Sequence, residues 1–149
     1  KDWLRLCGKD CEGIVLPSGP LLVAAQLPAD NPAKKPALEY ISQYEARHGQ
    51  GSVNTFGAYA WDAGMLLANA APVALQTARP GSREFRLALR DALEGTKNLA
   101  ASNGVFNMSA VDHQGLDQRA RVMVRVENNS WQLVKPPNDL RHQKIRGQR

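Results

Sequence analysis

The segment 55–78 restricts the possible folds of this chain more than any other segment. It reads TFGAYAWDAGMLLANAAPVALQTA, and Asp62 is its only charged residue. An apolar run of this length predicts a long helix, and a helix that is apolar on all sides is expected to be buried on most of them. Pro72 should kink this helix near the carbonyl group of Ala68.

The length and charge of the chain indicate one folded domain followed by a basic tail. The chain has 149 residues, of which 43% are apolar, so it has the size of roughly one domain with enough apolar residues for a core. Its net charge is +5, but the segment 135–149 carries five basic residues against one acidic residue. We therefore expect a nearly neutral body and a solvated, disordered basic tail. Nucleic-acid or membrane contact through that tail is the alternative.

The sequence shows no secretory signal, because its first residues, KDWLRLCGKD, contain no basic start followed by an apolar run. If the protein is exported, its N-terminal portion lies outside this sequence. The longest weakly polar run, 63–75, is shorter than the roughly 20 residues that span a bilayer. We expect a buried helix there and no membrane anchor.

Two cysteines, Cys7 and Cys11, are spaced C-x3-C near the start. The three histidines are scattered, so a zinc site lacks a local ligand set, and we expect no metal or other cofactor. A disulfide between the two cysteines would close a very short loop and needs a specific Cβ geometry. The expectation is therefore two free thiols.

Local patterns predict the remaining elements. β-Branched or alternating apolar residues predict extended segments, and helical spacing bounded by capping residues predicts helices. The predicted extended segments are 12–16, 21–25 and a C-terminal hairpin that turns at Asn128 and Asn129, and the predicted helices are 36–49 and 82–95. The proline-rich connector 17–20 interrupts regular structure and is a candidate hinge.

The residues most typical of an enzyme are Asp112 and His113, with either cysteine as a conceivable nucleophile. A small hydrolase with a Cys-His pair is therefore one alternative function. Neighbouring aspartate and histidine side chains usually diverge, however, and a turn stabilised by Asp112 and Asp117, with Gly115 reversing the chain, explains the same residues. We do not expect an enzyme.

Three motifs follow one another along the chain: AYAWDA, the loop SAVDHQGLD and the final RVMVRVENNSWQLV. Their order resembles that of the periplasmic solute-binding proteins of the branched-chain amino acid type, which serve ABC importers. The resemblance runs from about Trp3 to Val134. It implies an α/β fold that is the C-terminal portion of a two-lobed type I periplasmic-binding-protein fold, helix-rich with a small sheet and a C-terminal β-hairpin.

The same resemblance implies a division of the chain. Residues 1–134 would contain segments of both lobes, with crossovers near 17–27 and 109–125, and 135–149 would be the basic tail. Without the preceding half of such a protein, most strands of both sheets would be missing. The inner faces of the helices would then lack partners, and the chain would dimerise, swap elements or belong to a longer chain.

The solute of this family lies between the lobes, where an aromatic residue three positions before a tyrosine packs against it. Phe56 and Tyr59 match that spacing, and Trp3 lies where it would border the cleft. For Phe56, plain core packing is the alternative. The rival function is a ligand-sensing receptor domain of the same fold.

The function implied by the resemblance is an extracytoplasmic, periplasmic or extracellular, solute-binding component of an ABC importer. Its solute would be an amino acid or a related small carboxylate, possibly aromatic. Its protein partners would be the permease subunits of the importer. Neither an enzymatic activity nor a nucleic-acid partner is expected.

Overall fold

The computed structural model describes residues 2–135, so the predicted tail lies outside the described residues except for Lys135. The helices are α1 (Asp2–Cys7), α2 (Lys34–His48), α3 (Thr55–Ala74) and α4 (Arg83–Glu94), and three 3-10 turns are η1 (Gly8–Cys11), η2 (Pro20–Gln26) and η3 (Gln118–Ala120). The strands are β1 (Val15–Ser18), β2 (Leu99–Ala101), β3 (Gly104–Phe106), β4 (Val122–Glu127) and β5 (Ser130–Leu133). Over residues 2–135, no helix has the length and apolar character that crossing a membrane requires.

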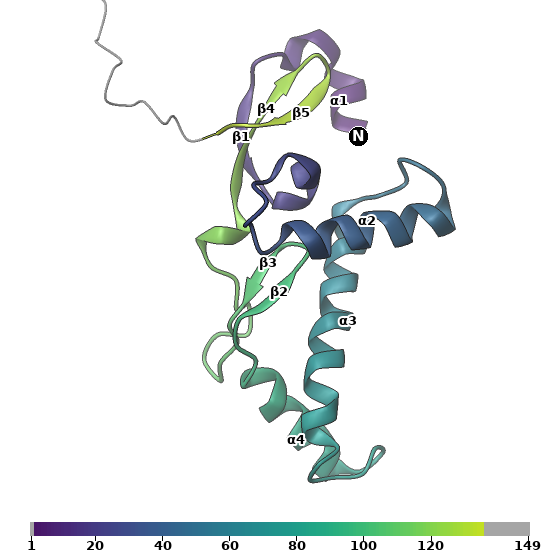
Figure 1. The fold of residues 1–149 in the computed structure, drawn as a ribbon, viewed down its shortest axis with the longest axis vertical. Helices are drawn as coiled ribbons and strands as arrows, with labels where there is room; N and C mark the ends of the chain where they lie inside the picture. Colours follow the sequence, from purple (N-terminus) through teal and green to yellow (C-terminus); the bar gives the residue numbers. More distant parts are fainter. Residues whose placement is uncertain (1, 136–149) are drawn as a thin grey trace, which may run out of the picture.

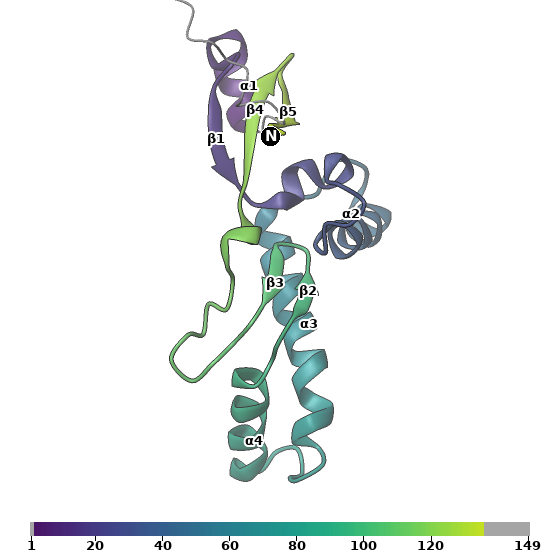
Figure 2. The same ribbon diagram turned by 60° about the vertical axis from the view of Figure 1, so that its left-hand side comes forward.

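The elements form an elongated molecule (Figures 1 and 2). The sheet β1-β4-β5 lies at one end together with α1, and α3 runs toward the other end, where α4 packs against it. Between the ends, α2 lies near the start of α3, and the β2–β3 hairpin runs alongside α3. The chain passes from the sheet to the helices after β1 and returns just before β4.

The three-stranded sheet is antiparallel, with β4 in the centre. The first predicted strand is displaced: β1 begins at Val15 and continues through Pro17, which pairs with Met123. An edge strand tolerates proline because one side of it makes no ladder hydrogen bonds. The interruption predicted for 17–20 therefore begins only at Gly19.

The segment 21–25 is not extended, as the sequence analysis expected, but belongs to the 3-10 turn η2. Pro20 stands in its first turn, where a fixed φ suits helical structure. Leu21 and Ala24 are buried against Ala37 and Tyr40 of α2. Tertiary burial on one side, not strand pairing, explains the apolar character of this segment.

The three predicted long helices are present, but the prediction that α3 is buried on most sides is wrong. Its buried residues are Ala58, Asp62, Ala70 and Ala74, which follow one stripe, whereas Phe56 is 80% exposed and Leu67 48% exposed. The helix α4 and the β2–β3 hairpin cover parts of α3, and its remaining surface has no covering layer among residues 2–135. The sequence-based expectation that helix faces would lack partners is thus consistent with the structure.

Cys7 and Cys11 form a disulfide, so the prediction of free thiols is wrong. The chain does not run from Cys7 into a strand. Gly8, with φ of +52°, lets it turn directly from α1 into η1, which brings the two Cα atoms to 5.7 Å. That separation is in the usual range for a disulfide.

The sequence analysis did not predict the β2–β3 hairpin. Its turn, Ser102–Asn103, is closed from outside by Asp62 of α3, whose two carboxylate oxygens accept four hydrogen bonds. The donors are the backbone amides of Ser102 and Asn103 (2.8 and 3.0 Å), the Ser102 hydroxyl (2.7 Å) and the Asn103 side-chain amide (2.9 Å). The charge that seemed out of place in an apolar helix therefore joins that helix to the hairpin.

Candidate functional site

A cleft of about 810 Å³ lies beside the start of α3. Its walls come from parts of the chain that are far apart in sequence, including α1, η2, α2 and β5. Its apolar lining consists of Trp3, Leu21, Leu22, Ile41, Phe56 and Trp131, together with Val53.

Aromatic rings line this cleft. Phe56 is the first aromatic residue of α3, and its ring meets the Tyr59 ring edge to face at 6.5 Å between centroids. Trp3 stacks on Trp131, with centroids 5.4 Å apart and planes 11° apart. The structure therefore places Phe56 and Trp3 in one cleft, whereas Tyr59 lies beside Phe56 rather than among the lining residues.

The start of α3 is held in place by side chains of its surroundings. The Asn54 side chain caps the helix by accepting a hydrogen bond from the Gly57 amide at 2.8 Å. The Tyr40 hydroxyl donates to the Asn54 carbonyl at 3.0 Å, and burial, with a contribution from Tyr44, raises the pKa of the Tyr40 phenol. A Cβ atom at Gly57 would overlap the Tyr40 hydroxyl. Glycine at this position therefore lets α2 and α3 approach closely.

The polar lining of the cleft comes from the turn between α2 and α3. Ser52 donates to the Gly49 carbonyl at 2.7 Å, and Glu45 accepts from the Gly51 amide at 2.7 Å. Glu45 is the only charged side chain among the described residues of the lining. Asn54 and Thr55 add the N-terminal end of α3, where the helix dipole is positive.

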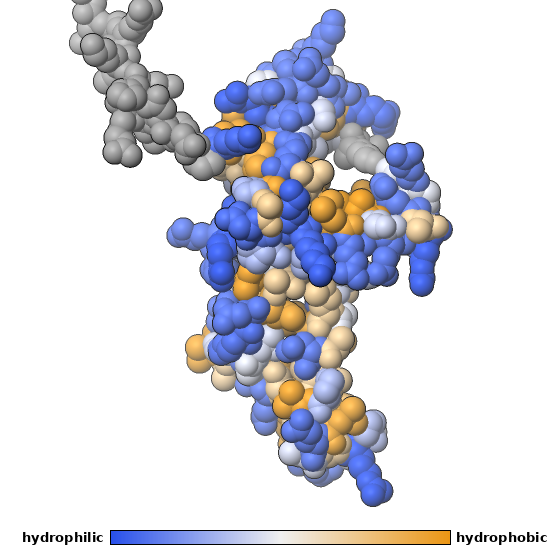
Figure 3. Space-filling model, in the orientation of Figure 1, coloured by the Kyte–Doolittle hydropathy of each residue, from blue (hydrophilic) through white to orange (hydrophobic). Residues whose placement is uncertain are grey.

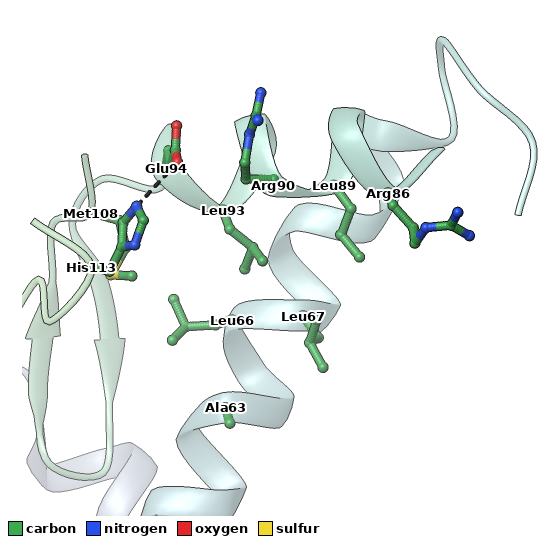
Figure 4. A pocket seen from close by; sticks show the side chains of 10 residues that line it. All are labelled: Ala63, Leu66, Leu67, Arg86, Leu89, Arg90, Leu93, Glu94, Met108 and His113. Carbon is green, nitrogen blue, oxygen red and sulfur yellow. Dashed lines mark hydrogen bonds and ion pairs between the residues drawn. The ribbon is translucent and has the colours of Figure 1, made fainter. Parts of the chain in front are cut away.

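A second, apolar pocket of about 540 Å³ lies between α3 and α4 (Figure 4). Leucines of both helices point into it, and Arg86, Arg90, Glu94 and His113 lie at its border. His113 Nε2 is 3.1 Å from the Glu94 carboxylate, which connects the loop before η3 to the end of α4. Apolar side chains are exposed at the same end of the molecule in Figure 3. The sequence analysis had not predicted this pocket.

The catalytic alternative does not assemble in the structure. Asp112 accepts hydrogen bonds from the amides of Gln114 and Gly115, both at 3.0 Å. It therefore stabilises a turn, which the sequence analysis gave as the alternative to a catalytic role. His113 contacts Glu94, and both cysteines are in the disulfide. Over residues 2–135, no group of three or more histidine, cysteine, aspartate or glutamate side chains is placed to hold a metal ion.

Comparison with known proteins identifies the fold. No protein-family profile and no curated protein sequence matches the chain. Solved structures do match it: Rp1789 of Rhodopseudomonas palustris strain CGA009 has 40% sequence identity and a TM-score of 0.82 over 90% of this chain. An extracellular ligand-binding receptor from Rhodopseudomonas palustris HaA2 has 40% identity and a TM-score of 0.83 over 90% of this chain, and another from Rhodopseudomonas palustris has 38% and 0.83.

The chain has the fold of part of an extracellular ligand-binding receptor. It spans 38% of the length of each of the first two solved structures and 37% of the third. The predicted fold class is confirmed as a helix-rich α/β structure with a small antiparallel sheet that matches part of this receptor fold. The likeness is consistent with a periplasmic-binding-protein fold and an extracellular or periplasmic location.

Proposed function

We propose that this chain supplies one side of the solute cleft in an extracytoplasmic solute-binding protein of the branched-chain amino acid type, which delivers its solute to the permease of an ABC importer. A ligand-binding role agrees with the similarity to extracellular ligand-binding receptors. The disulfide also agrees with an oxidising compartment outside the cytoplasm.

The observation that carries the proposal is the exposure of Phe56 in the cleft. An apolar ring that is 80% exposed adds nothing to a core, but it is suited to pack against a ligand. Trp3 lines the same cleft and would provide a second apolar contact. Tyr59, which touches Phe56 edge to face, would support that ring from outside the cleft and is a weaker candidate for direct contact.

The chemistry of the lining favours a small solute that carries a carboxylate, namely an amino acid or an aromatic acid. The positive end of α3 would attract the carboxylate, and Glu45 would attract an ammonium group. The aromatic rings would contact the apolar part of the solute. Further contacts would come from the parts of the receptor fold that this chain does not span.

The proposed mechanism is closure of two lobes around the solute, with segments of both lobes in residues 1–134. The crossovers near 17–27 and 109–125 would connect the lobes, and 17–20 and 109–115 would absorb the backbone rotation. Solute would favour the closed state only through contacts that the open state lacks. The closed form would then be recognised by the permease subunits.

We also propose that the exposed apolar surface of α3 and α4 is covered in solution, either by a second copy of this chain or by a swapped element. Leu67, Val73, Leu75 and Leu87 are each at least 40% exposed on these helices or next to them. Light scattering at several concentrations would give the mass. A strictly monomeric chain would contradict this part of the proposal.

A thermal-shift screen tests the solute-binding proposal. The screen uses L-amino acids, benzoate and phenylacetate, and compares the native chain with Phe56→Ala and with Leu38→Ala, a control at an exposed apolar residue of α2 outside the cleft. A solute at about 100 times its dissociation constant should stabilise the folded state by about 2.7 kcal/mol. We expect a shift in the native chain and in Leu38→Ala that is lost in Phe56→Ala. An equal shift in all three proteins would remove Phe56 from the site, and no shift with any solute would contradict binding by this chain.

A further inference from the structure

The Cys7–Cys11 disulfide lies next to the tryptophan pair that lines the cleft. Cys11 is buried in a cluster with Leu4 and Val126, and Cys7 and Trp131 pack against that cluster. Trp3, which stacks on Trp131, belongs to the same helix as Cys7. The disulfide and one wall of the cleft are thus parts of a single packed unit.

Two parts of this unit are fixed by the sheet. Trp131 lies in β5, and the Gln26 side chain binds the backbone at and just after it, donating to the Trp131 carbonyl at 2.9 Å and accepting from the Leu133 amide at 2.8 Å. The segment after Cys11 is also tied to β4, because Gly13 donates to the Val126 carbonyl at 2.9 Å and Val126 donates to the Ile14 carbonyl at 3.0 Å. Trp131 and the segment just after Cys11 therefore have backbone contacts that do not involve α1.

The helix α1 is short and mostly exposed. It has only 6 residues, and so short a helix is not stable by itself in water. Leu4 is its buried apolar residue, whereas Leu6 is 75% exposed and Trp3 is 44% exposed. The covalent bond from Cys7 to Cys11 joins this helix to the segment that Gly13 ties to β4.

We propose that the Cys7–Cys11 disulfide is a positioning device for Trp3, and that solute binding in the cleft depends on its oxidised state. The bond holds α1 against the anchored segment, so that the Trp3 indole stays on Trp131 and completes the apolar wall of the cleft. The dependence of binding rests on the proposed function, whereas the positioning of Trp3 does not. Cys7 and Cys11 act through Trp3 and touch no solute themselves.

Reduction by dithiothreitol tests whether the disulfide positions Trp3 or instead stabilises the whole sheet. Its two thiols close to a cyclic disulfide while the Cys7–Cys11 bond breaks and takes up two electrons and two protons, giving two cysteine thiols. Far-ultraviolet circular dichroism then measures the exciton coupling of the stacked indoles. Trp3→Ala provides the spectrum without the stack, and hydrogen exchange of β4 and β5 reports whether the sheet remains folded.

We expect the exciton signal of the oxidised chain to fall toward that of Trp3→Ala in the reduced chain and in the Cys7→Ser/Cys11→Ser variant, while β4 and β5 keep their protection. Lys9→Ala, an exposed change between the cysteines, should keep the signal. An unchanged signal after reduction would overturn the positioning role. Loss of protection throughout the sheet would also overturn it, because the bond would then stabilise the whole sheet.

Binding is measured with benzoate and with L-leucine in both redox states. Losing one aromatic contact should weaken the affinity about twofold to tenfold in the reduced chain. Equal affinity in both states, despite a lost exciton signal, would overturn the dependence of binding on the disulfide. If the oxidised chain binds neither compound, the proposed function is contradicted, and the exciton comparison still decides whether the disulfide positions Trp3.

Discussion

The two hairpins of this chain are closed in different ways. The β4–β5 turn contains Asn128 and Asn129, both in the left-handed region with φ of 51° and 56°. A two-residue hairpin turn of this kind needs positive φ at both positions, which asparagine tolerates better than most residues. The β2–β3 turn at Ser102 and Asn103 instead depends on Asp62, a residue 40 positions earlier in the chain.

This difference shows which parts of the fold can form independently. The β4–β5 hairpin carries its turn signal in its own sequence. The β2–β3 hairpin is short, and its turn amides find their acceptor only after α3 has packed beside it. We therefore expect β2–β3 to form together with α3, and β4–β5 to tolerate changes in α3.

Asp62→Ala should have the largest effect. The substitution leaves buried donors of Ser102 and Asn103 without an acceptor, and it should lower the free energy of unfolding by about 3 kcal/mol. Urea unfolding measures the loss, and hydrogen exchange should show it first in β2–β3. Asp112→Ala, in an exposed turn, is the control. An equal loss of protection in β4–β5 would contradict the independence of the two hairpins.

Gly104→Ala tests the packing of the same hairpin against the returning chain. Gly104 has φ of +151°, and an added Cβ atom would lie 2.9 Å from the Ala120 Cβ atom. We expect the free energy of unfolding to fall by about 2 kcal/mol, measured by thermal or urea unfolding.

At Gly64, an added Cβ atom would meet nothing within 4 Å. Gly64→Ala should therefore raise the free energy of unfolding by about 0.5 to 1 kcal/mol, measured in the same urea titration. A lower free energy of unfolding would contradict the expectation that a methyl group fits at this position.

Asn129→Ala tests the local turn. Alanine in the left-handed region should cost about 1 kcal/mol, whereas Asn129→Gly should be close to neutral. The measurement is the urea midpoint of both variants, combined with hydrogen exchange of β4 and β5. If both variants lose the same stability, the asparagine side chain rather than its backbone conformation would be responsible.

The smallest effect is expected from Asp117 at the start of η3. Hydrogen bonds from the Arg119 side chain and backbone amide lower the pKa of the Asp117 carboxyl group below its ordinary value. Its small stabilisation is therefore present above the unfolded-state pKa and is lost as the pH falls through the folded-state pKa. The difference in urea midpoint between the native chain and Asp117→Asn should shrink over that acidic range. A difference that does not change with pH would contradict the contribution of the carboxylate charge.

Much of the local structure could be predicted from the sequence. Asn54 and Ser82 cap their helices, the Ser82 hydroxyl accepting from the Phe85 amide at 3.0 Å, and both asparagines of the final turn have positive φ. These features depend on a few neighbouring residues, whose backbone preferences and short hydrogen bonds act within one turn. The family resemblance also pointed to Phe56 and Trp3, which both line the cleft, and their binding role stays a prediction.

Only the tertiary structure decided the rest. No local pattern indicates that Asp62 faces a hairpin or that Trp3 and Trp131 stack at one cleft. The apolar character of α3 alone could not tell a buried side from one that the described chain leaves open. Pairings between distant residues depend on the path of the whole backbone, because a side chain's partner is set by what packs beside it and not by its neighbours in sequence.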